Sequence, residues 1–276
     1  MNHDVKITDL EDRLRDMKRV LVAFSGGVDS TLLLRVAHEV LGENALAVTA
    51  VSDIHAPEEF SRARSVVREW GVKHFTLKTD ELDDERFISN PENRCYFCKL
   101  KLFTMILSLA REKDIPVVLD GSNADDMHEI RPGMKALREL GIRSPLQEAG
   151  LTKPEIRAAA RSMGLPIWNQ PALACLASRI PFGRAITREK IQRVYRAESL
   201  LRDMGFQQVR VRDHSPIARI EVEKEDRIRL IQDPAASRVI REFRRLGFYY
   251  VTLDLEGYRS GSLHIAADAN QNKKGG

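Results

Sequence analysis

The chain has 276 residues, of which 43% are hydrophobic and 30% are charged, and its formal net charge is +4. This is an ordinary globular mixture whose length favours two domains, and so small a charge does not by itself indicate nucleic-acid binding. No apolar run approaches the roughly 20 residues of a membrane-spanning helix, and the charged N-terminal stretch lacks the apolar segment of a signal peptide. We therefore expect a cytoplasmic protein that has no membrane partner.

Short apolar runs alternate with amphipathic stretches over the first half of the chain. We expect strands at 19–24, 45–52, 74–80 and 116–122. We expect helices at 29–41, 57–70 and 95–113. This order predicts an α/β fold with a doubly wound parallel sheet and helices on both faces, in which ligands bind at the carboxyl ends of the strands.

The pattern changes after Thr187. A helix is expected at 188–204 and helices again over 224–246, with strands at 207–213, 217–223 and 248–256. These elements predict a smaller α+β domain. The resulting division is a first domain over 1–186, a second over 187–265 and a polar tail over 266–276 that we expect to be disordered.

Two glycines and several hydroxyl side chains follow the first predicted strand, in FSGGVDST (24–31). Gly26 and Gly27 allow a tight turn with exposed N–H groups, which together with the next helix N-terminus form an anion cradle. Further donors come from the hydroxyls of Ser25, Ser30 and Thr31. No lysine follows the second glycine as in a Walker A loop. Asp29 is either a Mg²⁺ ligand or a first-turn acid favoured by the helix dipole.

A second motif, DGSNADD (120–126), follows the fourth predicted strand. Gly121 would allow the backbone to approach a nucleotide closely. Candidate contacts to substrate or Mg²⁺ are Asn123, Asp125 and Asp126. Taken alone, the stretch also fits an Asx-rich turn between a strand and a helix.

The three cysteines are Cys95, Cys98 and Cys175, an odd number that argues against a disulfide framework. Cys95 and Cys98 would lie on one face of the first helical turn, where the helix N-terminus and the neighbouring Arg94 and Lys99 favour thiolates. The pair alone also fits a redox pair, half a zinc site or two buried apolar residues. Three thiolates can hold a [4Fe–4S] cluster with one iron left open for an extra sulfide.

The two motifs resemble those of the N-type ATP pyrophosphatases, in which the PP-loop holds the pyrophosphate of ATP. Over 19–264 the chain resembles the LarE family, through NRCYFCK, ACLASRIPFG, VRVRDH and GFYYVTLDLEGYRSGSLH. The resemblance implies an ATP- and Mg²⁺-dependent sulfur transferase of nickel-pincer cofactor biosynthesis. Such an enzyme adenylates the carboxylates of pyridinium-3,5-biscarboxylic acid mononucleotide and replaces AMP with sulfur to give thiocarboxylates.

The resemblance also implies roles for individual residues. In single-cysteine members, the cysteine that matches Cys175 gives up its own sulfur and becomes dehydroalanine. This chain departs from that pattern through its additional CxxC, which favours a cluster on Cys95, Cys98 and Cys175 and catalytic turnover. The resemblance places Ser178 and Arg179 in the active site and Arg210 and Arg212 at the substrate phosphate.

Glu198 also matches a family acid and is a candidate metal ligand, although an exposed helix glutamate fits as well. The expected partners are the pyridinium mononucleotide, a sulfide donor, other enzymes of the pathway and further copies of the chain. Two other functions fit the motifs. A tRNA thiolase would share the loop and cluster but needs a basic RNA surface, and a nucleotide sensor would bind ATP without turnover.

Overall fold

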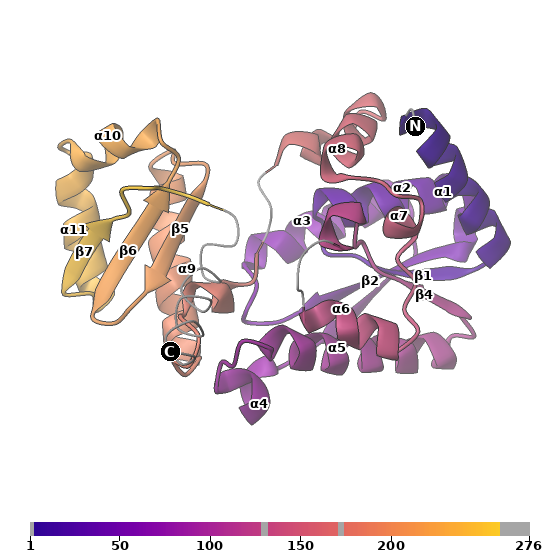
Figure 1. The fold of residues 1–276 in the computed structure, drawn as a ribbon, viewed down its shortest axis with the longest axis horizontal. Helices are drawn as coiled ribbons and strands as arrows, with labels where there is room; N and C mark the ends of the chain where they lie inside the picture. Colours follow the sequence, from indigo (N-terminus) through magenta and orange to yellow (C-terminus); the bar gives the residue numbers. More distant parts are fainter. Residues whose placement is uncertain (1–2, 128–131, 171–173, 260–276) are drawn as a thin grey trace, which may run out of the picture. The chain divides into compact units, whose positions relative to one another are not determined.

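The computed structural model describes residues 3–127, 132–170 and 174–259. The chain forms two compact units, which we describe separately (Figure 1). The first unit comprises residues 1–80 and 93–173, and the second comprises 81–92 and 174–276. Among the described residues, no helix is both long and apolar enough to cross a membrane.

The first unit is built on a four-stranded parallel sheet in the order β3-β2-β1-β4. Its strands are β1 (Val20–Ala23), β2 (Ala45–Val51), β3 (His74–Lys78) and β4 (Val117–Leu119). All four coincide with strands expected from the sequence, which confirms the predicted fold class. The parallel direction brings the carboxyl ends of these strands to one edge of the sheet.

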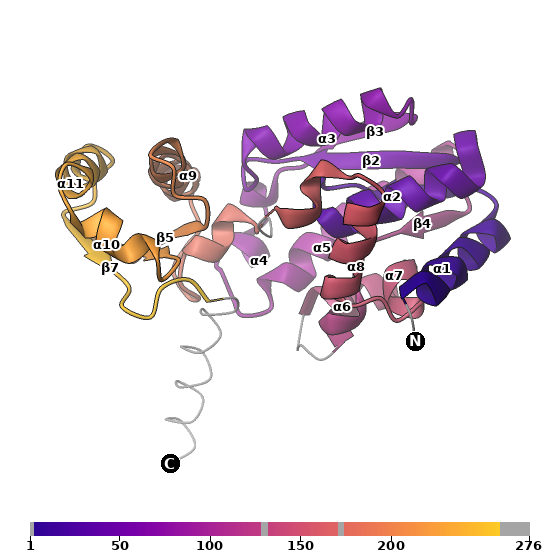
Figure 2. The same ribbon diagram turned by 90° about the horizontal axis from the view of Figure 1, so that it is seen from above.

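Helices cover both faces of this sheet. One layer contains α1 (His3–Met17), α2 (Val28–Leu41), α3 (Pro57–Glu69), α7 (Pro145–Glu148) and α8 (Lys153–Ser162). The other contains α5 (Arg94–Glu112) and α6 (Pro132–Glu139), which lie below the sheet in Figure 1. Figure 2 shows α1, α2, α3 and α8 spread over the opposite face. Side chains along β1 alternate between the two faces of the sheet, so Val20 and Val22 pack into the apolar core on one face and Leu21 into the core on the other.

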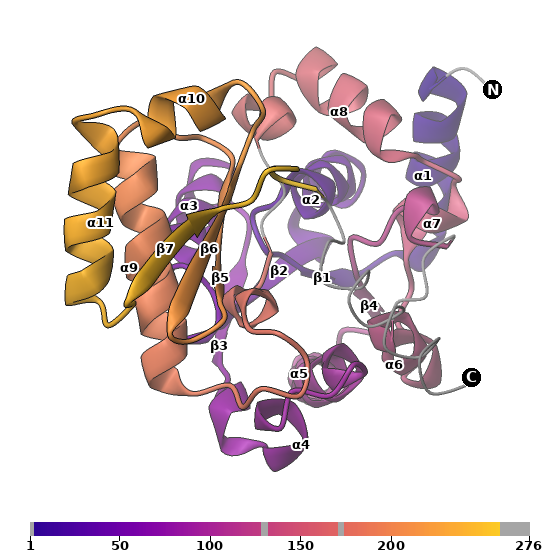
Figure 3. The same cartoon turned by 60° about the vertical axis from the view of Figure 1, so that its left-hand side comes forward.

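The second unit is a small α+β structure. Its sheet has the order β5-β6-β7, with β5 and β6 antiparallel and β6 and β7 parallel. The strands are β5 (Val209–Asp213), β6 (Ile217–Val222) and β7 (Tyr250–Leu253). The helices are α4 (Glu85–Ile88), α9 (Arg188–Asp203), α10 (Asp226–Ile231) and α11 (Ala235–Arg245). Figure 3 shows α9 and α11 side by side against the sheet, where they share its apolar core.

The boundary between the units differs from the predicted boundary at 186/187. Residues 81–92 and 174–186 belong to the second unit. The buried amide of Asn90 explains this, since its Nδ2 donates to the carbonyl oxygens of Ile180, Pro181 and Arg184 at 3.2, 2.8 and 2.9 Å. These contacts join segments about ninety positions apart, so local sequence patterns do not reveal them. The predicted tail, 266–276, lies outside the described residues.

Candidate functional site

The SGG loop connects β1 to α2 in the conformation that its glycines allow. Gly26 has φ +75°, and a Cβ added there would lie 3.2 Å from the Cβ of Ala63 on α3. The loop is held by hydroxyls, because Ser25 Oγ lies 3.1 Å from Ser30 Oγ and accepts from the N–H of Gly27 at 3.3 Å. The predicted tight turn is therefore present before the N-terminus of α2, and anion binding by it stays a prediction.

The remaining predicted residues of this loop differ in exposure. Ser30 also donates to the carbonyl of Gly27 at 3.2 Å, and it is buried. Thr31 is 1% exposed, and its hydroxyl makes no hydrogen bond within the described part of the chain. Asp29 is partly exposed in the first turn of α2, which is the position expected for either of its two predicted roles.

The second motif lies against this loop. A Cβ added to Gly121 would lie 3.1 Å from the backbone nitrogen of Ser30, so any larger residue would push the two segments apart by a few tenths of an ångström. Asn123 is buried, and its Nδ2 donates to Asp29 Oδ1 at 3.1 Å. The structure therefore brings together two motifs that are about ninety residues apart in the sequence.

Asp125 and Asp126 make local structural contacts in this motif. Asp126 accepts from the backbone N–H of Asn123 at 2.9 Å, and Asp125 accepts from the backbone N–H of Lys153 at 2.8 Å. The first is a contact of an Asx-rich turn, and the second anchors the start of α8. Direct contacts of either residue with a nucleotide or Mg²⁺ stay predictions.

Two polar groups near this edge of the sheet were missed from the sequence. The carboxylate of Asp120 is buried and accepts from Ser144 and Ser122 at 2.5 and 2.6 Å, and Lys99 Nζ lies 3.5 Å from it. Lys99, expected to favour nearby thiolates, is therefore paired with a carboxylate. The other missed group is the side chain of Lys153, which forms an ion pair with Asp29. No local pattern marks either contact.

The cysteine pair occupies the predicted position in the first unit. Cys95 is exposed and Cys98 half-buried, and both lie in the first turn of α5. Cys175 lies in the second unit, half-buried at the N-cap of a 3₁₀ turn, Leu176–Arg179. None of the three forms a disulfide within the described chain. Over the described ranges, no three or more His, Cys, Asp or Glu side chains gather as a metal site.

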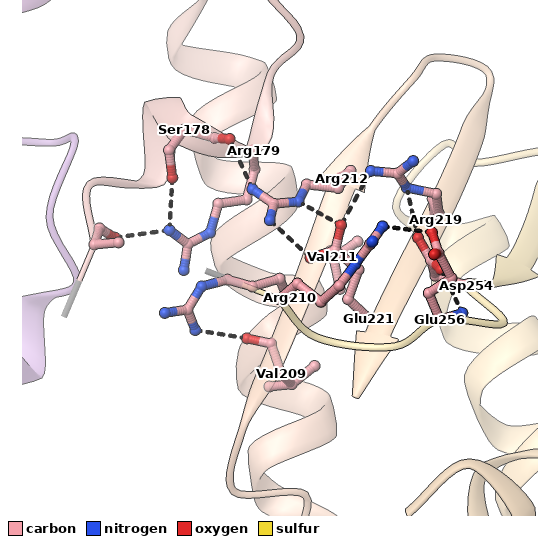
Figure 4. Close-up of polar contacts among 12 residues, drawn as sticks. Ser178, Arg179, Val209, Arg210, Val211, Arg212, Arg219, Glu221, Asp254 and Glu256 are labelled. Atoms are coloured by element: carbon pink, nitrogen blue, oxygen red, sulfur yellow. Dashed lines mark hydrogen bonds and ion pairs between the residues drawn. The ribbon is translucent and has the colours of Figure 1, made fainter. Parts of the chain in front are cut away.

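The second unit contains a buried set of charged residues that we call the arginine cluster. Its members are Arg179, Glu198, Arg210, Arg212 and Glu221. Figure 4 shows the part around β5 and β6. Arg210 and Arg212 lie two residues apart on β5, and the strand register places Glu221 of β6 opposite Arg210. These two arginines therefore share one face of β5, and the intervening Val211 packs into the apolar core.

Two arginine–carboxylate pairs hold the cluster. Arg179 donates through Nε and Nη2 to Glu198 at 2.7 and 3.0 Å, and Arg212 donates through the same atoms to Glu221 at 2.9 and 2.7 Å. Such fork-to-fork pairs fix both the position and the plane of each guanidinium. Arg212 Nη1 also donates to the carbonyl of Ser178 at 3.0 Å.

Glu198 is completely buried, which excludes the alternative of an exposed helix glutamate. It also accepts from the N–H of Val211 at 3.0 Å. Burial acts to raise the pKa of Glu198, but Arg179, the charge of Arg210 and the N–H of Val211 together hold this pKa below its ordinary value. Both carboxylate oxygens thus contact a guanidinium, and a role as metal ligand stays a prediction.

Arg179 also fixes the backbone next to Cys175. Its Nη1 donates to the carbonyls of Ala174 and Cys175 at 2.8 and 3.1 Å and to Ser178 Oγ at 2.9 Å. Since Glu198 in turn fixes Arg179, the buried carboxylate sets the conformation of the turn that carries the cysteine. The predicted residues Cys175, Ser178 and Arg179 are therefore brought together.

Arg210 contacts a carbonyl group and an aromatic ring. Its Nη1 donates to the carbonyl of Val209 at 2.8 Å, and its guanidinium lies 5.2 Å from the ring centre of Tyr258. Burial, followed by the charge of Arg179, lowers the pKa of Arg210 to about 10, so it stays charged at neutral pH. With three cations and two anions, the arginine cluster carries an excess positive charge and is suited to a phosphate.

Known proteins resemble this chain along nearly its whole length. The PP-loop domain model matches residues 2–144. An uncharacterized protein of Synechocystis sp. is 46% identical over 94% of this chain and 97% of its own length. Pyridinium-3,5-bisthiocarboxylic acid mononucleotide synthase of Lactiplantibacillus plantarum is 42% identical over 91% of each chain. An uncharacterized protein of Methanocaldococcus jannaschii is 32% identical over 92% of this chain and 98% of its own length.

Proposed function

This chain belongs to the LarE family of PP-loop proteins, and from that premise we propose that it is an ATP-dependent sulfur transferase. Its substrate is pyridinium-3,5-biscarboxylic acid mononucleotide, and its products are thiocarboxylates, AMP and pyrophosphate. The observation that carries the proposal is the contact between Gly121 and Ser30, which joins the two nucleotide motifs into one site. A relative that the chain matches almost from end to end, and whose name states this product, supports the substrate.

The residues of the first unit fit ATP and Mg²⁺. The turn at Gly26 lies directly before the N-terminus of α2, where an anion is stabilised by backbone donors and by the helix dipole. Asp29 supplies one carboxylate, and Mg²⁺ usually takes one or two carboxylates together with substrate phosphates and water. Bound there, Mg²⁺ would neutralise charge on the pyrophosphate as it leaves.

The first step is adenylation of the substrate. A carboxylate oxygen of the pyridinium attacks the α-phosphorus of ATP, so a new oxygen–phosphorus bond forms while the bond to pyrophosphate breaks. The loop N–H groups and Ser25 and Ser30 stabilise the negative charge on the departing pyrophosphate. No proton is needed for this displacement, which explains why a loop without a general base is sufficient.

Sulfur then replaces AMP on the activated carbon. A sulfur nucleophile attacks the carbonyl carbon, and the bond to the AMP oxygen breaks, which leaves a thiocarboxylate. Arg179 positions the nucleophilic site, because it fixes the carbonyls of Ala174 and Cys175. A second round of both steps treats the other carboxylate.

The source of the sulfur is the finer part of the proposal. We infer that Cys95, Cys98 and Cys175 together hold a [4Fe–4S] cluster, which when bound supplies an iron without a protein ligand for an incoming sulfide. Two cysteines on one helical turn and a third beside Ser178 support this donor set. The alternative is sulfur transfer from Cys175 itself, after which the chain would carry dehydroalanine.

Iron and acid-labile sulfide, measured on protein purified anaerobically, separate these two sources. We expect about four irons per chain in the wild type and loss of the visible absorbance in Cys95→Ala. Absence of iron even after reconstitution, with loss of H₂S from Cys175 after turnover, would show the sacrificial mechanism instead. The chain has no fourth cysteine that could be replaced as a control, because all three are proposed cluster ligands.

Substrate binding involves the arginine cluster. We expect Arg210→Ala to raise the KM for the mononucleotide at least about tenfold, since a charge-assisted contact to phosphate is lost. Arg238→Ala, an exposed arginine of α11, is the matched control and should leave KM unchanged. An unchanged KM in Arg210→Ala would show that the arginine cluster does not bind the phosphate of the substrate.

We also propose that copies of the chain associate. The second unit exposes several large apolar side chains, namely Ile228, Ile231, Ile240, Tyr249, Tyr250 and Leu255. Burial of such side chains between copies is favourable. Light scattering coupled to size exclusion should give a mass above that of one chain, and Ile231→Lys should reduce it. A sulfide donor and other enzymes of the same pathway are the remaining proposed partners.

A further inference from the structure

Lys153 is the first residue of α8, and both its backbone N–H and its side-chain ammonium contact carboxylates. Its backbone N–H donates to Asp125 at 2.8 Å, and its Nζ forms an ion pair with Asp29 Oδ2. The side chains of Lys153 and Asp29 are 30% and 21% exposed, so the pair lies in a partly desolvated position. The ammonium group therefore lies beside the carboxylate that is expected to bind Mg²⁺.

These contacts belong to a closed ring of polar interactions that links four residues, Lys153, Asp29, Asn123 and Asp125. Asn123 Nδ2 donates to the other oxygen of Asp29 at 3.1 Å, while its Oδ1 accepts from the N–H of Asp125 at 3.0 Å. Each oxygen of Asp29 thus contacts a side chain of the protein itself. A divalent cation that takes Asp29 as a ligand would lie beside the Lys153 ammonium, and the repulsion between the two positive charges favours release of Lys153 from Asp29.

The backbone of Lys153 is held rigidly, whereas its long side chain can rotate. Thr152 and Glu155 form a capping box at the start of α8, and Lys6 Nζ donates to both oxygens of Glu155 at 2.7 and 2.8 Å. Released from Asp29, the ammonium would still lie at the carboxyl edge of the sheet. There it would meet the phosphates that the SGG loop binds.

We propose that Lys153 exchanges partners when the nucleotide binds. Without nucleotide its ammonium neutralises Asp29. With Mg²⁺ and pyrophosphate present, the metal takes Asp29, and Lys153 pairs with a phosphate oxygen. This inference rests on the proposed binding of ATP by the loop. It also supplies from α8 the lysine that the loop lacks, and it makes the binding of Mg²⁺ and of pyrophosphate cooperative through one side chain.

The exchange predicts shifts of opposite sign when Lys153 is replaced. Lys153→Met should bind Mg²⁺ alone more tightly, about threefold or more, because Asp29 loses its competing cation. The same variant should bind inorganic pyrophosphate at least about tenfold more weakly, because a charge-assisted contact is lost. A residue that only supports the fold would not move the two affinities in opposite directions.

Isothermal titration of the full-length protein tests this directly. Mg²⁺ alone, pyrophosphate in EDTA and pyrophosphate with Mg²⁺ are titrated into the wild type, Lys153→Met and Lys153→Arg. Lys113→Met, which removes a partly exposed lysine paired with Glu112 at the end of α5, is the matched control and should change none of the affinities. Lys153→Arg keeps the cation and should retain pyrophosphate binding within about threefold.

Asp29→Asn provides a second test that does not depend on the folding of Lys153→Met. It should weaken Mg²⁺ binding but leave pyrophosphate binding in EDTA unchanged or tighter, since Lys153 is then released. If Lys153→Met binds both ligands as the wild type does, or binds both more weakly, the exchange is overturned while the loop assignment stands. If the wild type binds no pyrophosphate at all, the proposed function fails and the exchange fails with it.

Discussion

The two units present groups suited to anions in opposite ways. In the first unit the SGG loop offers backbone N–H groups and small hydroxyls, and its conformation depends on Gly26. In the second unit the arginine cluster offers guanidinium groups that are almost fully buried and are fixed by the carboxylates Glu198 and Glu221. Under the proposed function, the loop would bind the pyrophosphate of ATP and the arginine cluster the phosphate of the mononucleotide.

This difference has an energetic consequence. The loop donors are uncharged dipoles, so losing one costs ligand affinity more than stability. The arginine cluster contains charges removed from water, and an unpaired buried charge destabilises the fold strongly. We therefore expect removal of a carboxylate from the arginine cluster to act mainly on folding and substitutions in the loop to act mainly on binding.

The largest expected effect follows from removal of the buried carboxylate. Glu198→Ala leaves Arg179 buried without its carboxylate and Val211 N–H without its acceptor. The free energy of unfolding of the second unit should fall by about 3–5 kcal/mol. Urea titration followed by circular dichroism measures this fall.

Glu189→Ala, on the exposed first turn of the same helix, is the control and should change the free energy of unfolding by less than about 0.5 kcal/mol. Equal effects of the two substitutions would show that Glu198 does not hold the arginine cluster together. The contrast between the two units would then have no energetic basis.

A smaller effect on stability, but a large one on binding, is expected for the loop. Gly26→Ala places a Cβ 3.2 Å from Ala63 at φ +75°, whereas Gly141→Ala has a similar φ of +68° and open space around it. Both should lose about 1–2 kcal/mol of stability from the backbone conformation. Only Gly26→Ala should weaken pyrophosphate binding, by about tenfold or more, since its N–H groups are displaced. Similar pyrophosphate affinities in both variants would show that the loop does not bind the anion.

The smallest effect concerns an ion pair at the surface of the first unit. The hydrogen bond from Lys6 lowers the pKa of Glu155 from an ordinary value of 4.5 to about 2. The ionised carboxylate therefore stabilises the fold above pH 4.5, and this contribution is lost as the pH falls towards about 2. Between about pH 5 and pH 3, Glu155→Gln should lose less unfolding free energy than the wild type. An identical pH dependence in the two proteins would contradict this assignment.

Local patterns in the sequence predict most of the fold and the nucleotide loop. Apolar runs mark the four parallel strands, and the strand-end position of Gly121 indicates that it lies at the same edge of the sheet as the SGG loop. The burial of Glu198 could not be predicted in this way, because its partners lie on another turn and another strand. Lys153 was missed for the same reason, as its ion pair joins residues 124 positions apart.

The measurement that tests the central claim most directly is pyrophosphate release from ATP and Mg²⁺ by the full-length protein. It is made with pyridinium-3,5-biscarboxylic acid mononucleotide, with bulk tRNA and with no acceptor. We predict release only with the mononucleotide, together with a product whose mass shows oxygen replaced by sulfur once a sulfur source is present. Release driven by tRNA would identify a thiolase, and no release with any acceptor would contradict the adenylation that the account requires.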